Sequence, residues 1–324
     1  MLNLQTTSRN ILLDIFKVIA ALFVIGAHSY FLLEYNKLSF RVITTGIFRI
    51  AVPFFFCVNG FFLYTVFKNN RIQTWLKRIG ILYIVWMLIY SYFWVYLQDF
   101  NVLKVMLTLV FGFNHLWYLA ALLVGGLVLY QLRNASNTVL ITAAFLFLLI
   151  GIGIQYIGHL HLFSQQTTLD KLFNYPPLHR NFLLFAFPLL SIGYVIRRTN
   201  FHTRFRKKSI SLLLMLGLVL LITENLIAYY FITGDVILNT YLSYLFLAPS
   251  LLIAAFTFKS TSNRNSKLLS SYSIALYLIH PFIIFLMYRF FTLDSATLLF
   301  VTILVSGIAS YLLLLLNKKL KYIL

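Results

Sequence analysis

The chain has 324 residues, of which 61% are hydrophobic and 10% charged, and its mean hydropathy is +0.89. Soluble domains are about 45–50% apolar and about 25% charged, so this composition argues against a soluble globular protein and makes lipid the expected solvent. A net charge of +19 in a soluble protein would suggest nucleic acid. Here the basic residues lie in short loops between apolar runs, where they act as topology signals. We therefore expect the lipid bilayer, and no nucleic acid, as a partner.

A membrane-spanning helix needs about 20 mainly apolar residues. Stretches of this kind follow one another along the chain at 11–33, 44–67, 79–97, 115–132, 138–157, 182–196, 209–231, 239–258, 271–290 and 295–316. The sixth is short and contains Pro188, which predicts a tilted or broken helix. Residues 101–113 are apolar but too short to span, and we expect them in the interface. The predicted fold class is all-α: a polytopic transmembrane helix bundle of about ten spans, with residues 1–324 as a single integral membrane domain and no soluble domain.

The basic residues predict the orientation of this bundle, because they concentrate on the cytoplasmic side of membrane proteins. Connections on the side of the N-terminus carry Lys68, Arg71, Lys77, Arg78 and six basic residues within 197–208. The opposite connections carry Lys37, Arg41, Lys104, Lys171 and Arg180. We expect both termini in the cytoplasm and the protein as a multi-pass protein of a cell membrane, the bacterial cytoplasmic membrane.

Charged side chains within a bilayer cost about 2.5–3.5 kcal/mol on insertion scales and usually mark function. The first expected helix contains Asp14, Lys17 and His28. Lys17 and His28 are eleven residues apart, which places them on nearly the same helix face and about 16 Å apart along the axis; Asp14 lies one turn before Lys17. We expect this polar stripe to face the interior of the bundle. The alternative is a lysine that extends to the inner interface and a histidine bonded to a neighbouring helix.

Polar residues also mark the second and third expected spans. Arg49 lies near the outer end of the second span, above a proline-loosened turn at Pro53, and Asn59 lies deeper. Arg49 can also be an interfacial arginine above a kink. Lys77 and Arg78 open the third span, where they can meet phosphates arriving from the cytoplasm or serve as ordinary positive-inside residues.

Later spans add further candidates. His115 and Trp117 open the fourth span, where they can form part of an aromatic belt or bind a polar acceptor. Glu224 in the seventh span is a buried carboxylate that can pair with Arg49 or a histidine, and His280 precedes Pro281 in the middle of the ninth. No metal site is expected, because three loop histidines fit solvated residues better than metal ligands: His159, His161 and His179.

Five segments together resemble one protein family. They are LDIFKVIAALFVIGAHS (13–29), FRIAVPFFFCVNGFFL (48–63), LKRIGILYIVW (76–86), NHLWYLAALL (114–123) and SYSIALYLIHP (271–281). In this order they are similar to the acyltransferase 3 family of integral membrane O- and N-acyltransferases, and the resemblance covers nearly the whole chain.

The resemblance implies roles for several residues. His28 matches the proposed catalytic histidine of the family, and Lys17 stands where the family commonly has arginine, so the charge is kept while the bidentate fork is lost. Asn59 stands where many members have serine, which makes a serine role impossible there. Lys77 and Arg78 correspond to the basic residues that enter the family's third span.

The reaction implied by the resemblance moves an acyl group, commonly acetyl, from cytoplasmic acyl-CoA to a hydroxyl or amine of a cell-surface or lipid-linked carbohydrate. Acyl-CoA (acetyl-CoA) is then a co-substrate, the acceptor is a carbohydrate or glycolipid, and no bound cofactor is expected. His28 would act as general base or carry the acyl group. Lys17 and Arg78 would hold donor phosphates or polarise the thioester. The residues assigned to substrate binding are Asp14, Arg49, Asn59, Arg78, His115, Trp117, Glu224 and His280.

Two other classes of function compete with this interpretation. Some relatives are membrane domains attached to a racemase and linked to serine uptake, so the alternative is a transporter of a small polar or amino-acid solute. The third hypothesis is a sensor or assembly subunit without turnover. The candidate oligomeric state is a homodimer.

Overall fold

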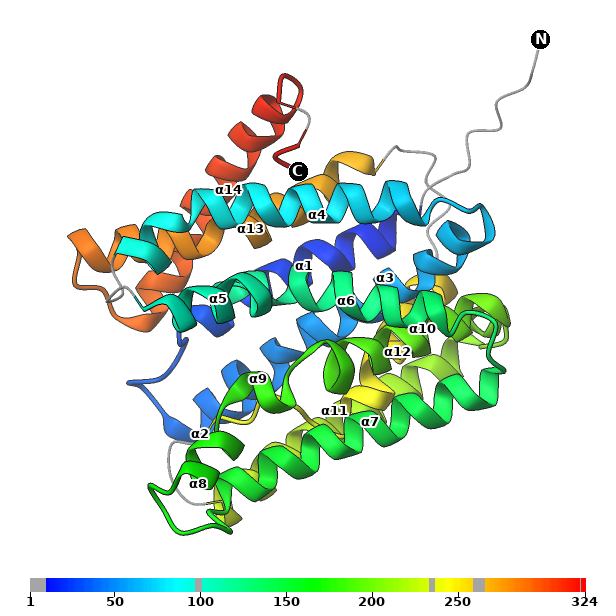
Figure 1. The fold of residues 1–324 in the computed structure, drawn as a ribbon, viewed down its shortest axis with the longest axis horizontal. Coiled ribbons are helices and arrows are strands. Elements are labelled where there is room, and N and C mark those ends of the chain that lie inside the picture. The colour runs from blue at the N-terminus through cyan, green and yellow to red at the C-terminus, as the bar shows by residue number, and fades with distance from the viewer. Residues whose placement is uncertain (1–9, 97–100, 233–236, 259–265, 321) are drawn as a thin grey trace.

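The computed structural model describes residues 10–96, 101–232, 237–258, 266–320 and 322–324, and no strand occurs within these ranges. Most helices run along the long axis of the molecule (Figure 1). The long helices are α1 (Ile11–His28), α3 (Ala51–Lys68), α4 (Ile72–Ile89), α7 (Asn137–His159), α11 (Lys207–Phe231), α13 (Lys267–Phe290) and α14 (Ser295–Asn317). The shorter ones are α5 (Val102–Phe111), α6 (Trp117–Gln131), α10 (Phe187–Arg198) and α12 (Tyr244–Thr257), with small helices α2 (Lys37–Ser39), α8 (Thr168–Phe173) and α9 (Pro176–His179).

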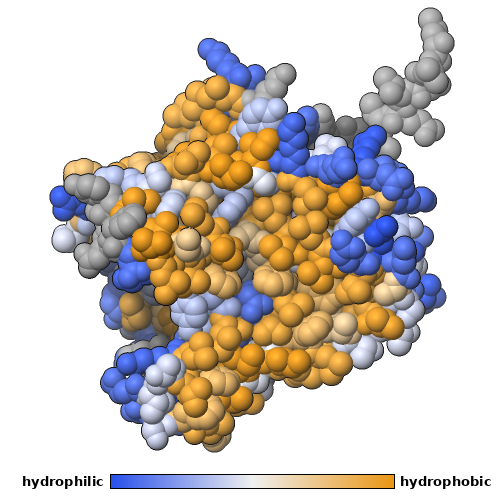
Figure 2. All heavy atoms as spheres, viewed as in Figure 1, coloured by the Kyte–Doolittle hydropathy of each residue, from blue (hydrophilic) through white to orange (hydrophobic). Residues whose placement is uncertain are grey.

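The surface fits a protein dissolved in lipid. Hydrophilic residues gather toward the left and right ends of the view in Figure 2, and mainly hydrophobic residues cover the middle. Large apolar side chains such as Leu88, Leu212 and Phe300 are exposed on the outer faces of their helices. Together with seven long apolar helices, this surface makes the protein a multi-pass membrane protein, because such a belt is stable only against hydrocarbon.

The lengths of the helices do not support the predicted number of ten spans. In the described residues, seven helical segments are long and apolar enough to cross a membrane, or eight if α5 and α6 count as one span bent by 53°. The predicted spans at 182–196 and 239–258 coincide with α10 and α12, which have 12 and 14 residues. At 1.5 Å per residue these helices are about 18 and 21 Å long, shorter than the hydrocarbon core of about 30 Å.

Two predicted spans begin with irregular helical turns. The stretch before α3 is a π-helix (Phe40–Gly46) followed by a 3₁₀-helix (Ile47–Ile50), and α10 follows a π-helix (Phe182–Ala186). Pro53 and Pro188 lie in the first turns of α3 and α10, where a missing N–H leaves no hydrogen bond unmade. Pro188 lies directly after the change from π-helix to α-helix, and helical turns continue through the predicted span without a gap, so a tilt or break there stays a prediction. Arg49 lies within the 3₁₀ turn rather than in a regular helix.

α3 and α10 approach each other closely through two glycines. A Cβ added at Gly60 would lie 2.0 Å from the backbone oxygen of Leu190, and one added at Gly193 would lie 2.0 Å from the backbone oxygen of Cys57. Both contacts are with backbone, which cannot move aside as a side chain can. The close packing of α3 against α10 therefore requires a glycine at residue 60. α1 packs against α3, α13, α12 and α14.

This packing predicts that Gly60→Ala destabilises the fold by about 1–3 kcal/mol, the usual cost of overpacking a core. The matched control is Gly80→Ala, because nothing lies within 4 Å of a Cβ at that position in α4 and alanine is the better helix former. Thermal unfolding in detergent should give a lower midpoint for the Gly60 variant and an unchanged or higher one for the control. Equal midpoints would show that the helices can separate at no cost.

Candidate functional site

Two cavities lie along α1. The larger, which we call the Lys17 cavity, has a volume of about 760 Å³, and its polar lining residues are Asn10, Asp14, Lys17, Asn59, Thr65, Arg78, Tyr118, Arg197, Ser270, Ser273 and Tyr277. The smaller, which we call the His28 cavity, has a volume of about 240 Å³, and its polar and aromatic lining residues are His28, Tyr30, Phe48, Arg49, Asn114, Trp117, Arg180, Phe185 and Asn239. The predicted stripe on the first helix is thus divided: Asp14 and Lys17 line one cavity and His28 lines the other.

The ammonium group of Lys17 is held inside the bundle. Its Nζ lies 2.9 Å from Oδ1 of Asp14 and 3.4 Å from the hydroxyl of Ser270 on α13. The Ser266 hydroxyl donates to the other carboxylate oxygen of Asp14 at 2.6 Å. These contacts tie the beginning of α1 to α13, so Lys17 is positioned by its partners rather than extended to the interface.

Two arginines add positive charge to the Lys17 cavity. Arg78 comes from α4 and Arg197 from the end of α10. Arg197 was not singled out from the sequence, where it belongs to a run of basic residues after the sixth predicted span. Asn59 completes the polar lining by donating to the hydroxyl of Tyr118 at 2.8 Å. The cavity therefore combines cations with a largely apolar wall, which suits a ligand with an anionic end and a long uncharged arm.

The His28 cavity contains two guanidinium groups. Nη1 of Arg49 donates to Oδ1 of Asn239 at 2.8 Å, and Nη1 of Arg180 donates to the same oxygen at 3.1 Å. The Arg180 guanidinium also lies over the ring of Trp117, 4.5 Å from its centre. Sequence reasoning missed Arg180 and Asn239, because Arg180 was counted only as a basic residue of a connection, Asn239 was only the first residue of a predicted span, and neither belongs to a motif.

A row of aromatic side chains lies between the cavities. The His28 ring is 5.1 Å from that of His280, which is 5.5 Å from that of His115. His115 is 5.4 Å from Tyr277, a residue of the Lys17 cavity, and Tyr277 donates to the backbone oxygen of His115. His115 and His280 are 1% and 0% exposed. Neither lines a cavity, and burial excludes the aromatic-belt alternative for His115.

Pro281 determines how His280 is held. A proline cannot donate to the carbonyl four residues earlier, which here belongs to Tyr277. Nδ1 of His280 lies 2.8 Å from that oxygen and must donate to it, since a carbonyl only accepts. The lone pair of the neutral ring is then on Nε2, which is buried and has no hydrogen-bond partner among the described residues.

The Tyr90 hydroxyl bridges two backbone groups of α13 in the turn next to His280. It donates to the backbone oxygen of Leu278 at 2.8 Å and accepts from the backbone N–H of Phe282 at 3.2 Å. These two backbone groups would bond each other in a regular helix. Tyr90 therefore keeps α13 continuous beside His280, a role that nothing in the sequence around residue 90 indicated.

Removing this bridge should loosen α13. We expect Tyr90→Phe to lower stability by about 1–3 kcal/mol, because it leaves a buried N–H and a buried C=O without partners. The control is Tyr311→Phe on α14, where the ring is 55% exposed. Thermal unfolding in detergent measures both, and a Tyr90 variant as stable as the control would mean that water replaces the hydroxyl or that the two backbone groups bond each other directly.

Glu224 lies outside both cavity linings. Its carboxylate accepts from the backbone N–H groups of Leu242 and Ser243 at 2.6 and 3.0 Å, just before α12. The expected pairing with Arg49 or a histidine is therefore wrong: the unpaired amides at the start of a helix satisfy a carboxylate well, and this gives Glu224 a structural function.

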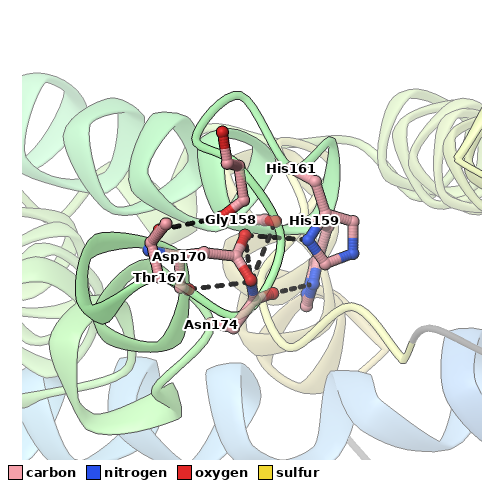
Figure 3. Close-up of polar contacts among 7 residues, drawn as sticks. Gly158, His159, His161, Thr167, Asp170 and Asn174 are labelled. Carbon is pink, nitrogen blue, oxygen red and sulfur yellow. Dashed lines mark hydrogen bonds and ion pairs between the residues drawn. The ribbon is translucent and has the colours of Figure 1, made fainter.

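His159, the last residue of α7, and His161 just beyond it have structural partners (Figure 3). His161 bonds Asp170 at 2.8 Å and His159 bonds Asn174 at 3.0 Å, while Asn174 also donates to the backbone oxygen of Gly158 at 3.0 Å. His179 is 1% exposed, so the expectation of a solvated side chain is wrong for it. Burial, more than the nearby Arg180, lowers its pKa to about 4 and keeps it neutral. Within the described residues, no group of His, Cys, Asp and Glu is arranged to hold a metal ion.

The sequence model of a family described as an acyltransferase domain matches residues 10–316. The chain belongs to the acyltransferase 3 family. The matched range includes every residue that lines the two cavities, so both belong to the part that acyltransferase 3 proteins share.

This member of the acyltransferase 3 family is also similar to two racemases. It is 27% identical to an amino-acid racemase of Enterococcus faecalis, over 95% of this chain and 46% of the racemase. It is 27% identical to a serine/alanine racemase of Enterococcus gallinarum, over 84% of this chain and 40% of that protein. The chain thus spans less than half the length of these curated relatives. No solved structure matches it.

Proposed function

We propose that this membrane acyltransferase transfers an acyl group, commonly acetyl, from cytoplasmic acyl-CoA to a hydroxyl or amine of a cell-surface or lipid-linked carbohydrate. The observation that carries the proposal is that α1 lines two cavities. Lys17 lines a large cationic one and His28 lines a small one. Family membership supports the reaction class. Two cavities on one helix suit a donor and an acceptor that approach from opposite sides of a membrane.

The Lys17 cavity is the proposed donor site. It lies at the end of the bundle where α3, α4 and α10 meet the basic connections around 68–78 and 197–208, which the positive-inside rule places in the cytoplasm. Its volume of about 760 Å³ is in the range of about 300–1,000 Å³ typical of ligand sites. Lys17, Arg78 and Arg197 would bind the phosphates of CoA, and the apolar wall would take the uncharged arm that ends in the thioester.

His28 is the proposed base or acyl carrier. As a base, its ring nitrogen takes the proton of the acceptor hydroxyl while that oxygen forms a bond to the thioester carbon; the carbon–sulfur bond breaks, and the CoA thiolate leaves and is protonated. As a carrier, the same nitrogen first bonds the acyl carbon while the carbon–sulfur bond breaks and the CoA thiolate leaves; the acceptor oxygen then bonds that carbon, the nitrogen–carbon bond breaks, and the acceptor's proton passes to the released ring nitrogen. His280 and His115 form a row of buried ring contacts from His28 to Tyr277 on the donor cavity, so packed polar side chains connect the two proposed sites.

Reconstituted protein tests this proposal. Proteoliposomes are given acetyl-CoA and an extract of cell-surface glycans, and released CoA is measured with a thiol reagent, together with labelled acetyl on the glycan. We expect both to depend on His28 and on access of acetyl-CoA to the face that carries the Lys17 cavity. Glycan acetylation without CoA release, or no transfer with any acceptor, would contradict the proposal.

The second candidate is a transporter of an amino-acid solute. It is supported by relatives named as an amino-acid racemase and a serine/alanine racemase, and by a small cavity with two guanidinium groups, which suit a carboxylate. Uptake of labelled serine or alanine into the same proteoliposomes, without any CoA release, would favour this candidate over the acyltransferase.

A further inference from the structure

We infer that the His28 cavity recognises a small unit bearing an anionic group, a carboxylate or a phosphate, next to the atom that is acylated. The inference rests on the proposed function, in which the acceptor occupies this cavity. It begins from the pair of arginines, Arg49 and Arg180, which come from segments more than a hundred residues apart and meet at Asn239.

The charge of this pair is not balanced by an ion pair within the part of the chain that the structure describes. Both guanidinium groups share one neutral amide oxygen, and neither forms an ion pair with any described residue. Glu224 bonds backbone N–H groups and Asp170 pairs with His161. Two adjacent cations in a partly buried site repel each other and lose hydration, and a bound anion removes both costs.

Both arginines keep hydrogen-bond donors for a ligand. A guanidinium carries five N–H donors, and the bonds from these two arginines to acceptors in the described residues all use Nη1. Nε of Arg49 is buried and has no partner among the described residues. Trp117 under Arg180 holds that guanidinium by its face and leaves its edge for a bidentate bond to a carboxylate or phosphate.

The size of the cavity and the place of His28 narrow the ligand. A volume of about 240 Å³ lies below the range of about 300–1,000 Å³ for drug-sized ligands, so it suits one sugar-sized unit rather than an oligosaccharide. His28 lines the same cavity, and a unit anchored through its anion can present a hydroxyl to that ring. The Lys17 cavity differs from the His28 cavity in its charge balance, because Asp14 already pairs with Lys17 there.

Calorimetric titration of the purified protein in an uncharged detergent tests the inference. The probes are glucuronate, glucose 6-phosphate and inorganic phosphate, with glucuronamide as a neutral match of the first. We expect at least one anion to bind about tenfold or more tightly than glucuronamide, equivalent to about 1.4 kcal/mol. Glucuronate and glucose 6-phosphate distinguish a carboxylate from a phosphate ligand.

Variants locate the binding site. Arg180→Gln and Arg49→Gln should each weaken anion binding about tenfold or more, whereas Arg204→Gln, the same change at an exposed arginine that lines neither cavity, should not. Asn239→Asp is a second approach that does not rely on removing an arginine. The new carboxylate would contact both guanidinium groups and cancel one of their two positive charges, so this variant should be at least as thermostable as the parent and should bind the anions more weakly.

The outcomes separate this inference from the proposed function. The inference fails if no probe anion binds better than glucuronamide, or if Arg180→Gln and Asn239→Asp bind the anions as well as the parent. His28-dependent CoA release would in that case leave the acyltransferase proposal standing. Arginine-dependent anion binding in a protein that never releases CoA would instead support the inferred site and overturn the proposed function.

Discussion

Replacing His28 with alanine is expected to lower acyl transfer by about 100-fold or more, the usual contribution of a positioned general base. Acetyl-CoA should still bind, because His28 lines the His28 cavity and not the Lys17 cavity. Steady-state CoA release should therefore show a lower kcat with a KM for acetyl-CoA close to that of the parent, and calorimetric titration with CoA should give an unchanged affinity.

A histidine outside both cavities provides the control. His161→Ala removes a partly exposed ring that bonds Asp170 of α8, and it should leave kcat unchanged. Labelled acetyl that remains on denatured parent protein but not on His28→Ala would identify His28 as an acyl carrier rather than a base. An unchanged kcat in His28→Ala would remove this residue from the mechanism.

The second large effect is expected at Lys17. Lys17→Met breaks an ion pair whose carboxylate, on Asp14, is only 2% exposed. Removing one partner of a buried pair costs about 3–5 kcal/mol, because the remaining charge has lost its counter-charge. We expect a large fall in the thermal midpoint, and also a higher KM for acetyl-CoA if Lys17 binds a phosphate.

A double variant separates these two roles. Asp14→Asn with Lys17→Met removes both charges, and replacing a whole buried pair by neutral side chains is often close to neutral for stability. The double variant should regain most of the thermal midpoint, whereas the raised KM should persist. Lys17→Arg keeps the positive charge and should retain both the thermal midpoint and the KM of the parent. Full recovery of KM in the double variant would mean that Lys17 serves stability alone.

Local spacing explains what could be predicted of the site. Within one α-helix the angle and distance between residues follow from the sequence alone, so the placing of Asp14 and Lys17 one turn apart, with His28 eleven residues further on, could be foreseen. The apolar runs and the five family segments were visible for the same reason, since each lies within a single element. Arg49, Trp117 and Arg78 could be named because they belong to those segments.

Hydropathy could not give the number of spans. It measures how apolar a stretch is, but not whether the stretch continues as one α-helix. Residues 182–196 are apolar, yet a π-helix, Asn181 as an N-terminal cap and Pro188 leave only 12 residues in α10. The carboxylate of Glu224 was equally ambiguous, because its partners at residues 242 and 243 are backbone groups that any sequence provides.

The sequence by itself determined the solvent of this protein, its helical class, its family segments and the polar face of its first helix, since each follows from composition or from neighbours along the chain. Only the tertiary structure decided that Lys17 and His28 line different cavities, and that Arg180 and Asn239 join Arg49 beside His28. The same is true of Tyr90 bridging α13 and of Gly60 against Leu190. These pairs are far apart in the chain, and packing between helices, which no local pattern encodes, brings them together.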